Sequence, residues 1–198
     1  MYPEYAEVNG KRYKINTDFR VAIKCDEIAR DNSIGDLERA LAIVYTLFGV
    51  EAIKDIENIE KLLKIAVKYL RCGAEVEDKE IKNERKEKRD IDFIQDQNYI
   101  ASSFKYDYGY NPYDKDYLHW YEFYNDLNNL SYSELGSCCI LSRIRAIRNT
   151  DVSKIKDADE RKRMIEAQKQ VAIKKDKKVL NDKQKQSATN FYKELFKE

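Results

Sequence analysis

Glycine and proline are scarce in this chain, and several glycines stand where apolar periodic segments end. The 198 residues include six glycines and two prolines, the residue types that most disfavour a helix interior. Gly49, Gly73 and Gly109 each follow a segment in which apolar residues recur every three or four positions, the spacing of an amphipathic helix. We therefore predict a mainly α-helical fold.

The N-terminal segment AEVNGKRYKI is the exception to this helical pattern. Asn9-Gly10 separates two short runs, residues 6–8 and 12–15. This dipeptide readily adopts the two positive φ angles of a type I′ turn. We therefore predict a small N-terminal β-hairpin.

Apolar residues at helical spacing predict three helices between the hairpin and Gly73. The first is capped by Asn16 or Thr17, the second ends at Gly49, and the third runs unbroken from about residue 51 to Gly73. The residues expected to face the core are Phe19, Ala22, Ile23, Ile28, Leu37, Ala40, Leu41, Val44, Leu47, Phe48, Ile53, Ile56, Ile59, Leu63, Ala66, Val67 and Leu70.

Composition divides the chain into four parts. Residues 1–73 form the hairpin and a helical subdomain, and residues 74–90, with thirteen charged side chains, form a solvated linker or an exposed helix. Residues 91–149 form an aromatic-rich helical subdomain, in which apolar spacing predicts one helix before Gly109 and two packed helices after it. Residues 150–198 are basic and largely helical, which predicts a long charged C-terminal helix or a segment that orders on a partner.

The charge balance and the N-terminal sequence exclude several classes of protein. The 37 basic and 36 acidic residues nearly cancel, so nothing demands an anionic partner. No apolar run approaches the roughly 18 residues of a membrane span, and the N-terminus lacks the apolar core of a secretory signal. The four cysteines match neither a disulfide framework nor C-x-x-C metal spacing. We therefore expect a cytoplasmic protein with no cofactor and no metal.

The segment DYLHWYEFYNDLNNL, residues 116–130, contains the only histidine and the only tryptophan. Treated as one helix, it places His119 on a polar side with Glu122 and its aromatic residues on a broad arc elsewhere. His119 and Glu122 could bind one metal ion, but no second histidine supplies a third ligand, and short catalytic motifs are missing. We therefore expect His119 to face solvent or a partner, His119→Ala to change the fold little, and the protein not to be an enzyme.

Two basic stretches raise the alternative of nucleic-acid binding. RIRAIR, residues 143–148, and KKDKK, residues 174–178, could neutralise phosphates, and the fifteen tyrosines could stack on bases. Against this, acidic residues dilute the tail, and the aromatic residues concentrate on the apolar arc of predicted helices. Nucleic acid is therefore the less favoured partner.

Several sequence blocks resemble one phage family in the same order and spacing. They are VNGKRYKINTDFRVAIKC, RALAIVYTLFG, YLRCG, DFIQDQNYIASSFKYDYGYNP and DYLHWYEFYNDLNNL. These blocks are similar to the bacteriophage "gene product fifteen" family of tailed phages and prophages of Gram-positive bacteria. The resemblance covers about residues 6–148, and the chain departs from the family pattern after Asn149.

The resemblance implies a tail-morphogenesis protein of the bacterial host cytoplasm, encoded between the major tail protein and the tape measure protein. Such a protein looks like a tail assembly chaperone that binds the tape measure protein, with the tail-tube protein as a further partner and a homo-oligomer as an open possibility. A structural component of the tail and a nucleic-acid-binding phage protein stay as alternatives. The family supplies no catalytic residues. The candidate partner-binding residues, which build either core or a groove, are Trp120, Tyr121, Phe123, Tyr124, Phe191, Leu195 and Phe196.

Overall fold

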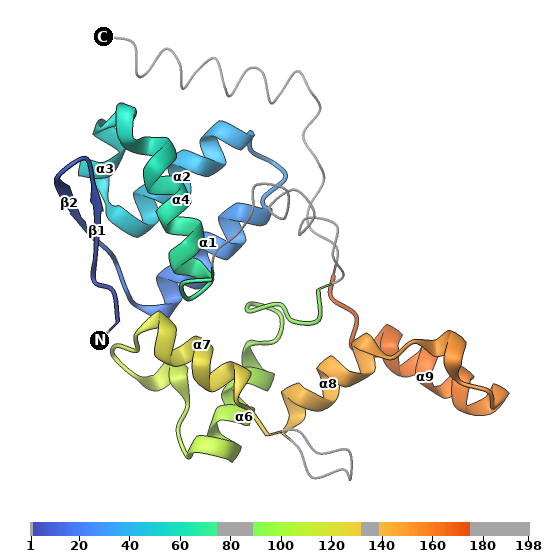
Figure 1. The fold of residues 1–198 in the computed structure, drawn as a ribbon. Coiled ribbons are helices and arrows are strands. Elements are labelled where there is room, and N and C mark those ends of the chain that lie inside the picture. Colours follow the sequence, from blue (N-terminus) through green and yellow to red (C-terminus); the bar gives the residue numbers. More distant parts are fainter. Residues whose placement is uncertain (1, 75–88, 132–138, 175–198) are drawn as a thin grey trace. The chain divides into compact units, whose positions relative to one another are not determined.

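The computed structural model describes residues 2–74, 89–131 and 139–174 and confirms a mainly α-helical protein with an N-terminal β-hairpin (Figure 1). The two strands are β1 (Tyr5–Val8) and β2 (Lys11–Lys14). The α-helices are α1 (Phe19–Arg30), α2 (Asp36–Phe48), α3 (Val50–Lys54), α4 (Ile59–Leu70), α6 (Gln97–Tyr108), α7 (Trp120–Asn128), α8 (Ile140–Asn149) and α9 (Ala158–Gln170). Short 3-10 helices are η1 (Ile56–Asn58), η2 (Pro112–Asp114) and η3 (Val152–Lys154).

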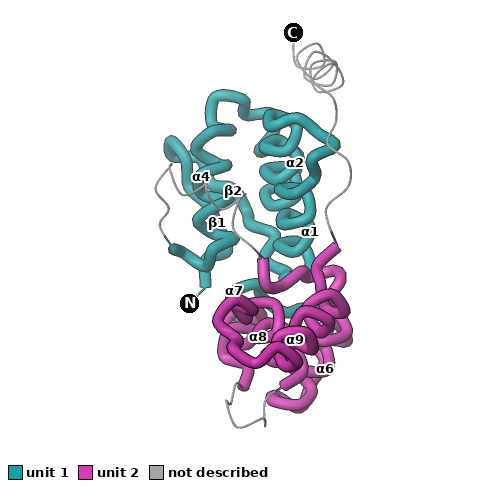
Figure 2. Tube along the Cα trace, turned by 90° about the vertical axis from the view of Figure 1, so that its right-hand side faces the viewer, with its two compact units in different colours: residues 1–77, 117–122, 175–198 teal, residues 78–116, 123–174 magenta. Residues whose placement is uncertain are grey.

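The described chain forms two compact units (Figure 2). Unit 1 contains the hairpin and α1 to α4, together with residues 117–122, and unit 2 contains the described residues of 78–116 and 123–174. These units divide the chain differently from the four ranges expected from composition, because residues 117–122 belong with the N-terminal unit and α9 belongs with α6 and α8. The expected linker at 74–90 and the end of the expected tail lie largely outside the described residues.

The hairpin forms at the predicted place. β1 and β2 are antiparallel, with Val8 opposite Lys11, and Asn9 and Gly10 have φ angles of 52° and 75°. Both positive values fit the type I′ turn that was predicted from the dipeptide. β1 packs against α4, and one face of the hairpin is buried through Ala6, Val8 and Tyr13.

Helices α1, α2 and α4 surround the core of unit 1, where α2 packs on both of the others. Most of the expected core positions are buried or half-buried. Two predictions were wrong, since Leu37 is 42% exposed and Ile56 is 56% exposed. Leu37 lies in the first turn of α2, before the buried apolar residues of that helix begin at Ile43, and Ile56 lies in η1 rather than in a continuous helix.

The predicted single helix from residue 51 to Gly73 is broken at Asp55. This residue has φ −95° and ψ 71°, which ends α3, and α4 begins only after η1. The Asp55 carboxylate accepts hydrogen bonds from Tyr13 Oη at 2.6 Å and Lys11 Nζ at 2.9 Å. Aspartate is disfavoured in a helix interior because its carboxylate forms hydrogen bonds that favour other backbone conformations. The hairpin therefore supplies the partners that stabilise this break.

The ends of the helices follow the sequence only in part. The cap of α1 is Asp18, whose carboxylate accepts from Arg20 N at 2.9 Å, and not the predicted Asn16 or Thr17. The stop after α4 is the predicted one, since Gly73 has φ 91° and donates its N–H to Lys68 O.

Unit 2 is built on α6, α8 and an aromatic core. The rings of Phe104 and Phe123 stack at 5.4 Å, and Phe93 lies 6.3 Å from Phe123. α8 packs against α6, where Leu141 N donates to Ser103 Oγ at 3.1 Å. The helix expected before Gly109 is α6, which starts at Gln97, and Ile94 lies in the preceding turn and is 52% exposed.

Helix α9 lies in the range where a long charged C-terminal helix was predicted, but it ends at Gln170, and the described residues 171–174 are not helical. Asp157 caps it by accepting from Glu160 N at 2.7 Å, and no residue of the helix is buried. Gln168 Nε2 instead donates to the carbonyls of Ile147, in the last turn of α8, and of Thr150, just after that helix. Among the described helices, none has the length and apolar character needed to cross a membrane.

Candidate protein-binding surface

Residues Tyr117–Trp120, here called the strap, lie against the start of α1 within unit 1. Leu118 O accepts from Phe19 N at 2.9 Å, and Trp120 N donates to Thr17 O at 2.8 Å. Between these bonds, Asp18 and His119 form an isolated antiparallel bridge. The strap is therefore extended, and helix α7 begins only at Trp120.

Trp120 connects the strap to the C-terminal end of α4. Its side chain is 3% exposed, and its indole Nε1 donates to Leu70 O at 3.0 Å. Leu70 is the last residue of α4, where carbonyl groups have no helical partner. The tryptophan thus caps α4 with a side chain from a distant part of the sequence.

His119 is buried, which corrects the prediction that it faces solvent or a partner. It is 7% exposed, and its Nδ1 accepts from Tyr121 N at 3.0 Å. Its ring stacks on Tyr2 at 4.7 Å and meets the edges of Tyr121 at 5.5 Å and Tyr69 at 6.3 Å. The helical wheel misplaced His119 because the residue lies in the strap and not on the helix.

The surroundings of His119 favour its neutral form. Burial lowers the pKa of His119 below its ordinary value, an effect that the Pro3 carbonyl and the nearby carboxylates of Glu122 and Glu4 oppose. Because Nδ1 accepts a hydrogen bond, the proton of the neutral ring lies on Nε2. His119 is therefore an uncharged, packed ring near pH 7.

The neighbouring tyrosine and cysteine side chains are also uncharged. Burial raises the pKa of Tyr69 and raises that of Tyr121 to about 12. Burial likewise raises the pKa of the Cys72 thiol to about 12. The cluster offers aromatic rings and hydroxyl groups, which suit binding better than nucleophilic attack.

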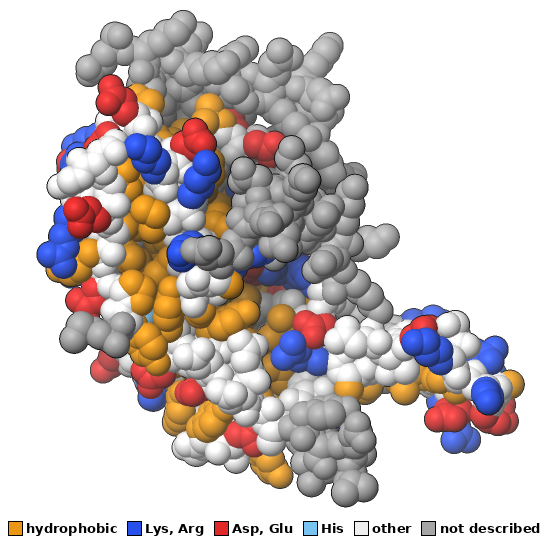
Figure 3. Space-filling model, in the orientation of Figure 1, with side chains coloured by type: hydrophobic (Ala, Val, Ile, Leu, Met, Phe, Trp, Pro, Cys, Tyr) orange, Lys and Arg blue, Asp and Glu red, His pale blue; other side chains and the backbone are white. Residues whose placement is uncertain are grey.

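Part of this cluster is accessible, and we call it the tyrosine surface: Tyr2, Glu4, Tyr117, Tyr121 and Glu122. Tyr2 is 42% exposed and Tyr117 is 56% exposed, while Tyr121 is half-buried and both glutamates are exposed. The rings of Tyr2 and Tyr121 lie 5.6 Å apart, and Tyr117 Oη lies 2.7 Å from Thr17 Oγ1. Hydrophobic side chains gather on the visible face of unit 1, where α4 ends and the N-terminal residues lie (Figure 3).

The residues predicted to bind a partner fall into three groups. Trp120 and Phe123 are 3% and 0% exposed, so in this conformation they build core. Tyr121 and Tyr124 are half-buried and keep some accessible surface. Three further candidates lie outside the described residues: Phe191, Leu195 and Phe196.

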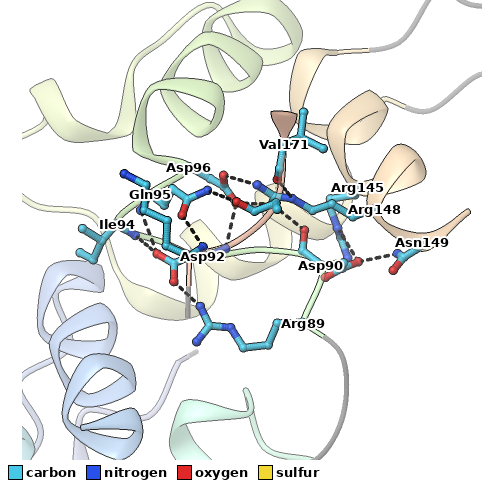
Figure 4. A network of polar contacts seen from close by, with 12 residues as sticks. Arg89, Asp90, Asp92, Ile94, Gln95, Asp96, Arg145, Arg148, Asn149 and Val171 are labelled. Atoms are coloured by element: carbon cyan, nitrogen blue, oxygen red, sulfur yellow. Dashed lines mark hydrogen bonds and ion pairs between the residues drawn. The ribbon is translucent and has the colours of Figure 1, made fainter. Parts of the chain in front are cut away.

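A buried polar network in unit 2 was missed by the sequence analysis (Figure 4). Arg148 and Asp96 are buried and share two hydrogen bonds, Nη1 to Oδ2 at 2.6 Å and Nη2 to Oδ1 at 2.8 Å. Arg148 also donates to the carbonyls of Val171 at 2.7 Å and Asp90 at 2.9 Å. One guanidinium therefore joins α8, the start of the unit and the segment after α9.

The same network holds the residues that follow α9. The Gln95 side chain donates to Ala172 O at 3.0 Å and accepts from Lys174 N at 2.9 Å. Arg145 Nε donates to the Asp90 carboxylate at 2.9 Å. These bonds pair the backbone of residues 171–174 with side chains of unit 2.

The network also explains the basic stretch RIRAIR. Arg145 and Arg148 are engaged with Asp90 and Asp96, and Arg143 is the exposed arginine of the three. A sequence signal existed, because Arg148 shares the buried face of α8 with Leu141 and Ile144. An arginine on an apolar helix face needs a carboxylate partner, although the sequence does not say which one.

Within the described ranges, no three histidine, cysteine, aspartate or glutamate side chains gather closely enough to hold a metal ion. His119 and Glu122, which the sequence suggested as a possible pair of metal ligands, therefore have no third such side chain close by in that part of the chain.

Comparison with known proteins places the chain in a family. No curated protein and no solved structure matches it. Residues 2–173 match the family model described as Bacteriophage Gp15 protein. The match includes α9 and ends within the segment held by Gln95 and Arg148, so the expected departure from the family pattern after Asn149 is corrected to residue 173. The chain belongs to the Bacteriophage Gp15 protein family.

Proposed function

We propose that this phage protein is a non-enzymatic tail assembly protein of the host cytoplasm that acts as a chaperone for the tape measure protein. The sequence blocks that resemble phage tail-morphogenesis proteins support a role in tail assembly. The observation that carries a binding role is the tyrosine surface, where Tyr2 and Tyr117 are about half exposed beside a packed aromatic cluster.

The chemistry of this surface suits reversible protein binding. Tyrosine gives a large apolar contact and a hydroxyl group at a low cost in side-chain entropy, and it is enriched at protein interfaces. Tyr121 of this surface is fixed by packing on the buried Tyr69, with ring centroids 5.1 Å apart. A rigid support reduces the entropy lost on binding.

Co-expression with the tape measure protein tests the proposal. We expect the tape measure protein to stay in the supernatant and to co-purify with this chain, and to aggregate when it is expressed alone. If the tape measure protein is equally insoluble in both cases, or if deletion of the gene leaves tail length and phage yield unchanged, the chaperone role is wrong.

A structural component of the tail is the rival function. Mass spectrometry of purified virions separates the two, because a structural component is present in fixed stoichiometry and an assembly chaperone is absent or present in traces. Nucleic-acid binding loses one of its supports, since Arg145 and Arg148 of RIRAIR pair with carboxylates inside unit 2.

A further inference from the structure

We propose that the tyrosine surface of unit 1 binds a segment of the protein partner that carries lysine or arginine side chains. This inference rests on the proposed function and names the chemistry of the partner segment.

Other tyrosine rings in the described chain already make cation–π contacts. The Arg12 guanidinium lies 3.8 Å from the centre of the Tyr5 ring, and Lys115 Nζ lies 3.9 Å from that of Tyr110. Tyr2 is exposed to the same degree as Tyr5, at 42% against 43%, but neither it nor Tyr117 has such a contact with any described residue. These two rings therefore offer aromatic surface to an external cation.

Two carboxylates give the tyrosine surface a negative charge. Glu122 directly follows Tyr121 in the first turn of α7, and Glu4 lies two residues after Tyr2. Their negative charge therefore lies beside the aromatic cluster, where both carboxylates act electrostatically on His119. Both side chains are exposed, and neither makes an ion pair within the described part of the chain. His119 itself is held neutral by burial and does not compensate them.

The combination of exposed tyrosine rings and carboxylates favours a positively charged partner. A lysine or arginine side chain gains from the ring faces and from both carboxylates, and arginine also stacks flat on tyrosine. An acidic peptide or a nucleic-acid phosphate meets like charge at Glu4 and Glu122. The surface therefore favours a basic protein segment over both.

Matched variants of the full chain test this inference. Tyr117→Ser combined with Glu122→Gln removes one ring and one charge from the surface. The control, Tyr45→Ser with Glu57→Gln, removes a tyrosine that is 54% exposed and an exposed glutamate elsewhere in unit 1. Tyr117→Phe keeps the ring and loses only the hydroxyl contact with Thr17.

The probe is a set of overlapping fluorescent peptides that covers the tape measure protein, measured by anisotropy. We expect the bound peptides to be rich in lysine or arginine, with an affinity that falls as salt rises. The surface variant should bind them about tenfold more weakly, while the control variant and Tyr117→Phe stay within about twofold of the unmodified chain. Trp120 fluorescence checks that unit 1 remains folded in each variant.

The outcomes separate this inference from the proposed function. If the tape measure protein co-purifies but the bound peptides lack basic residues, or if the surface variant binds like the control, the inference is wrong and the chaperone role stands. If a variant unfolds, the Glu4→Gln and Glu122→Gln pair without the tyrosine change decides the charge dependence. If no tape measure segment binds and nothing co-purifies, both proposals are wrong.

Discussion

Arg148 and Asp96 form a two-pronged ion pair in which neither side chain is more than 4% exposed. Asp96 also accepts from Asp92 N at 2.9 Å, and Arg148 donates to the backbone carbonyls of Val171 and Asp90. A buried pair stabilises a fold only when further hydrogen bonds compensate its desolvation, and three such bonds surround this pair.

Removing one side of this pair should destabilise unit 2 strongly. Arg148→Met leaves the Asp96 carboxylate buried without its partner, which costs about 3–5 kcal/mol of unfolding free energy. Urea denaturation followed by circular dichroism measures this loss, because the helices of unit 2 contribute to that signal. Arg143→Met is the control on the same helix, and its exposed side chain should change stability by less than about 0.5 kcal/mol.

Replacing both partners tests the explanation. The double variant Arg148→Met, Asp96→Leu removes the uncompensated charge, so it should recover part of the stability lost in Arg148→Met. A double variant that is as unstable as the sum of the two single variants would show that the pair is not the cause.

His119→Ala should destabilise unit 1, contrary to the expectation from the sequence. The change removes a packed ring and the acceptor of the Tyr121 N–H, which together are worth about 2–4 kcal/mol. The reference is Glu57→Ala, an exposed site in the same unit. Urea denaturation followed by Trp120 fluorescence gives the value, and equal midpoints for the two variants would contradict the buried position of the ring.

The stability of unit 1 should also depend on pH through His119. Its pKa in the folded protein is lowered by burial, so the unfolded chain binds more protons below its ordinary pKa near 6.5. This contribution to stability is present above that value and is lost as the pH falls below it. His119→Asn, which keeps an acceptor near the Nδ1 position, should lose less stability between about pH 7 and 5.5 than the unmodified chain does.

Trp120→Phe should weaken unit 1 while retaining most of its packing. The phenyl ring fills much of the indole site but cannot donate to Leu70 O, and the unpaired carbonyl costs about 1–3 kcal/mol. Thermal unfolding followed by circular dichroism measures the change, since the variant lacks tryptophan. A melting temperature equal to that of the unmodified chain would mean that the indole bond contributes nothing.

Asp55 should make the protein sensitive to acid. Hydrogen bonds from Tyr13 and Lys11 lower the pKa of Asp55 to about 2, from an ordinary value of 3.8. A depressed carboxyl pKa stabilises the fold above the ordinary value and loses that effect as the pH falls toward 2. Trp120 fluorescence between pH 5 and 2 should therefore show a smaller loss of stability for Asp55→Asn than for the unmodified chain.

Local sequence signals predicted the elements whose causes are local. The hairpin follows from Asn9-Gly10, and the end of α4 follows from Gly73. The helices α1, α2, α6 and α8 follow from apolar spacing, with errors of a few residues at their ends. Each of these features is decided by residues that are close together in the sequence.

The predictions that were wrong or missing share a different cause, because each concerns a residue whose partner is distant in the sequence. Asp55 breaks a helix because side chains from the hairpin hold its carboxylate, and His119 is buried because the strap pairs with residues 17–19. Arg148 is buried because Asp96 faces it across unit 2. Apolar periodicity carries no information about such pairs, so the tyrosine surface could not be assembled from the sequence alone.

The position of the strap has a consequence for synthesis of the protein. The first 74 residues supply the hairpin and four helices of unit 1, but the cap of α4 and the pairing partner of Phe19 come from residues 118–120. A ribosome must therefore add more than forty further residues before unit 1 can close. The N-terminal half of a nascent chain released before Tyr117 should therefore be sensitive to protease. The same half should be protected in a chain released after Glu122.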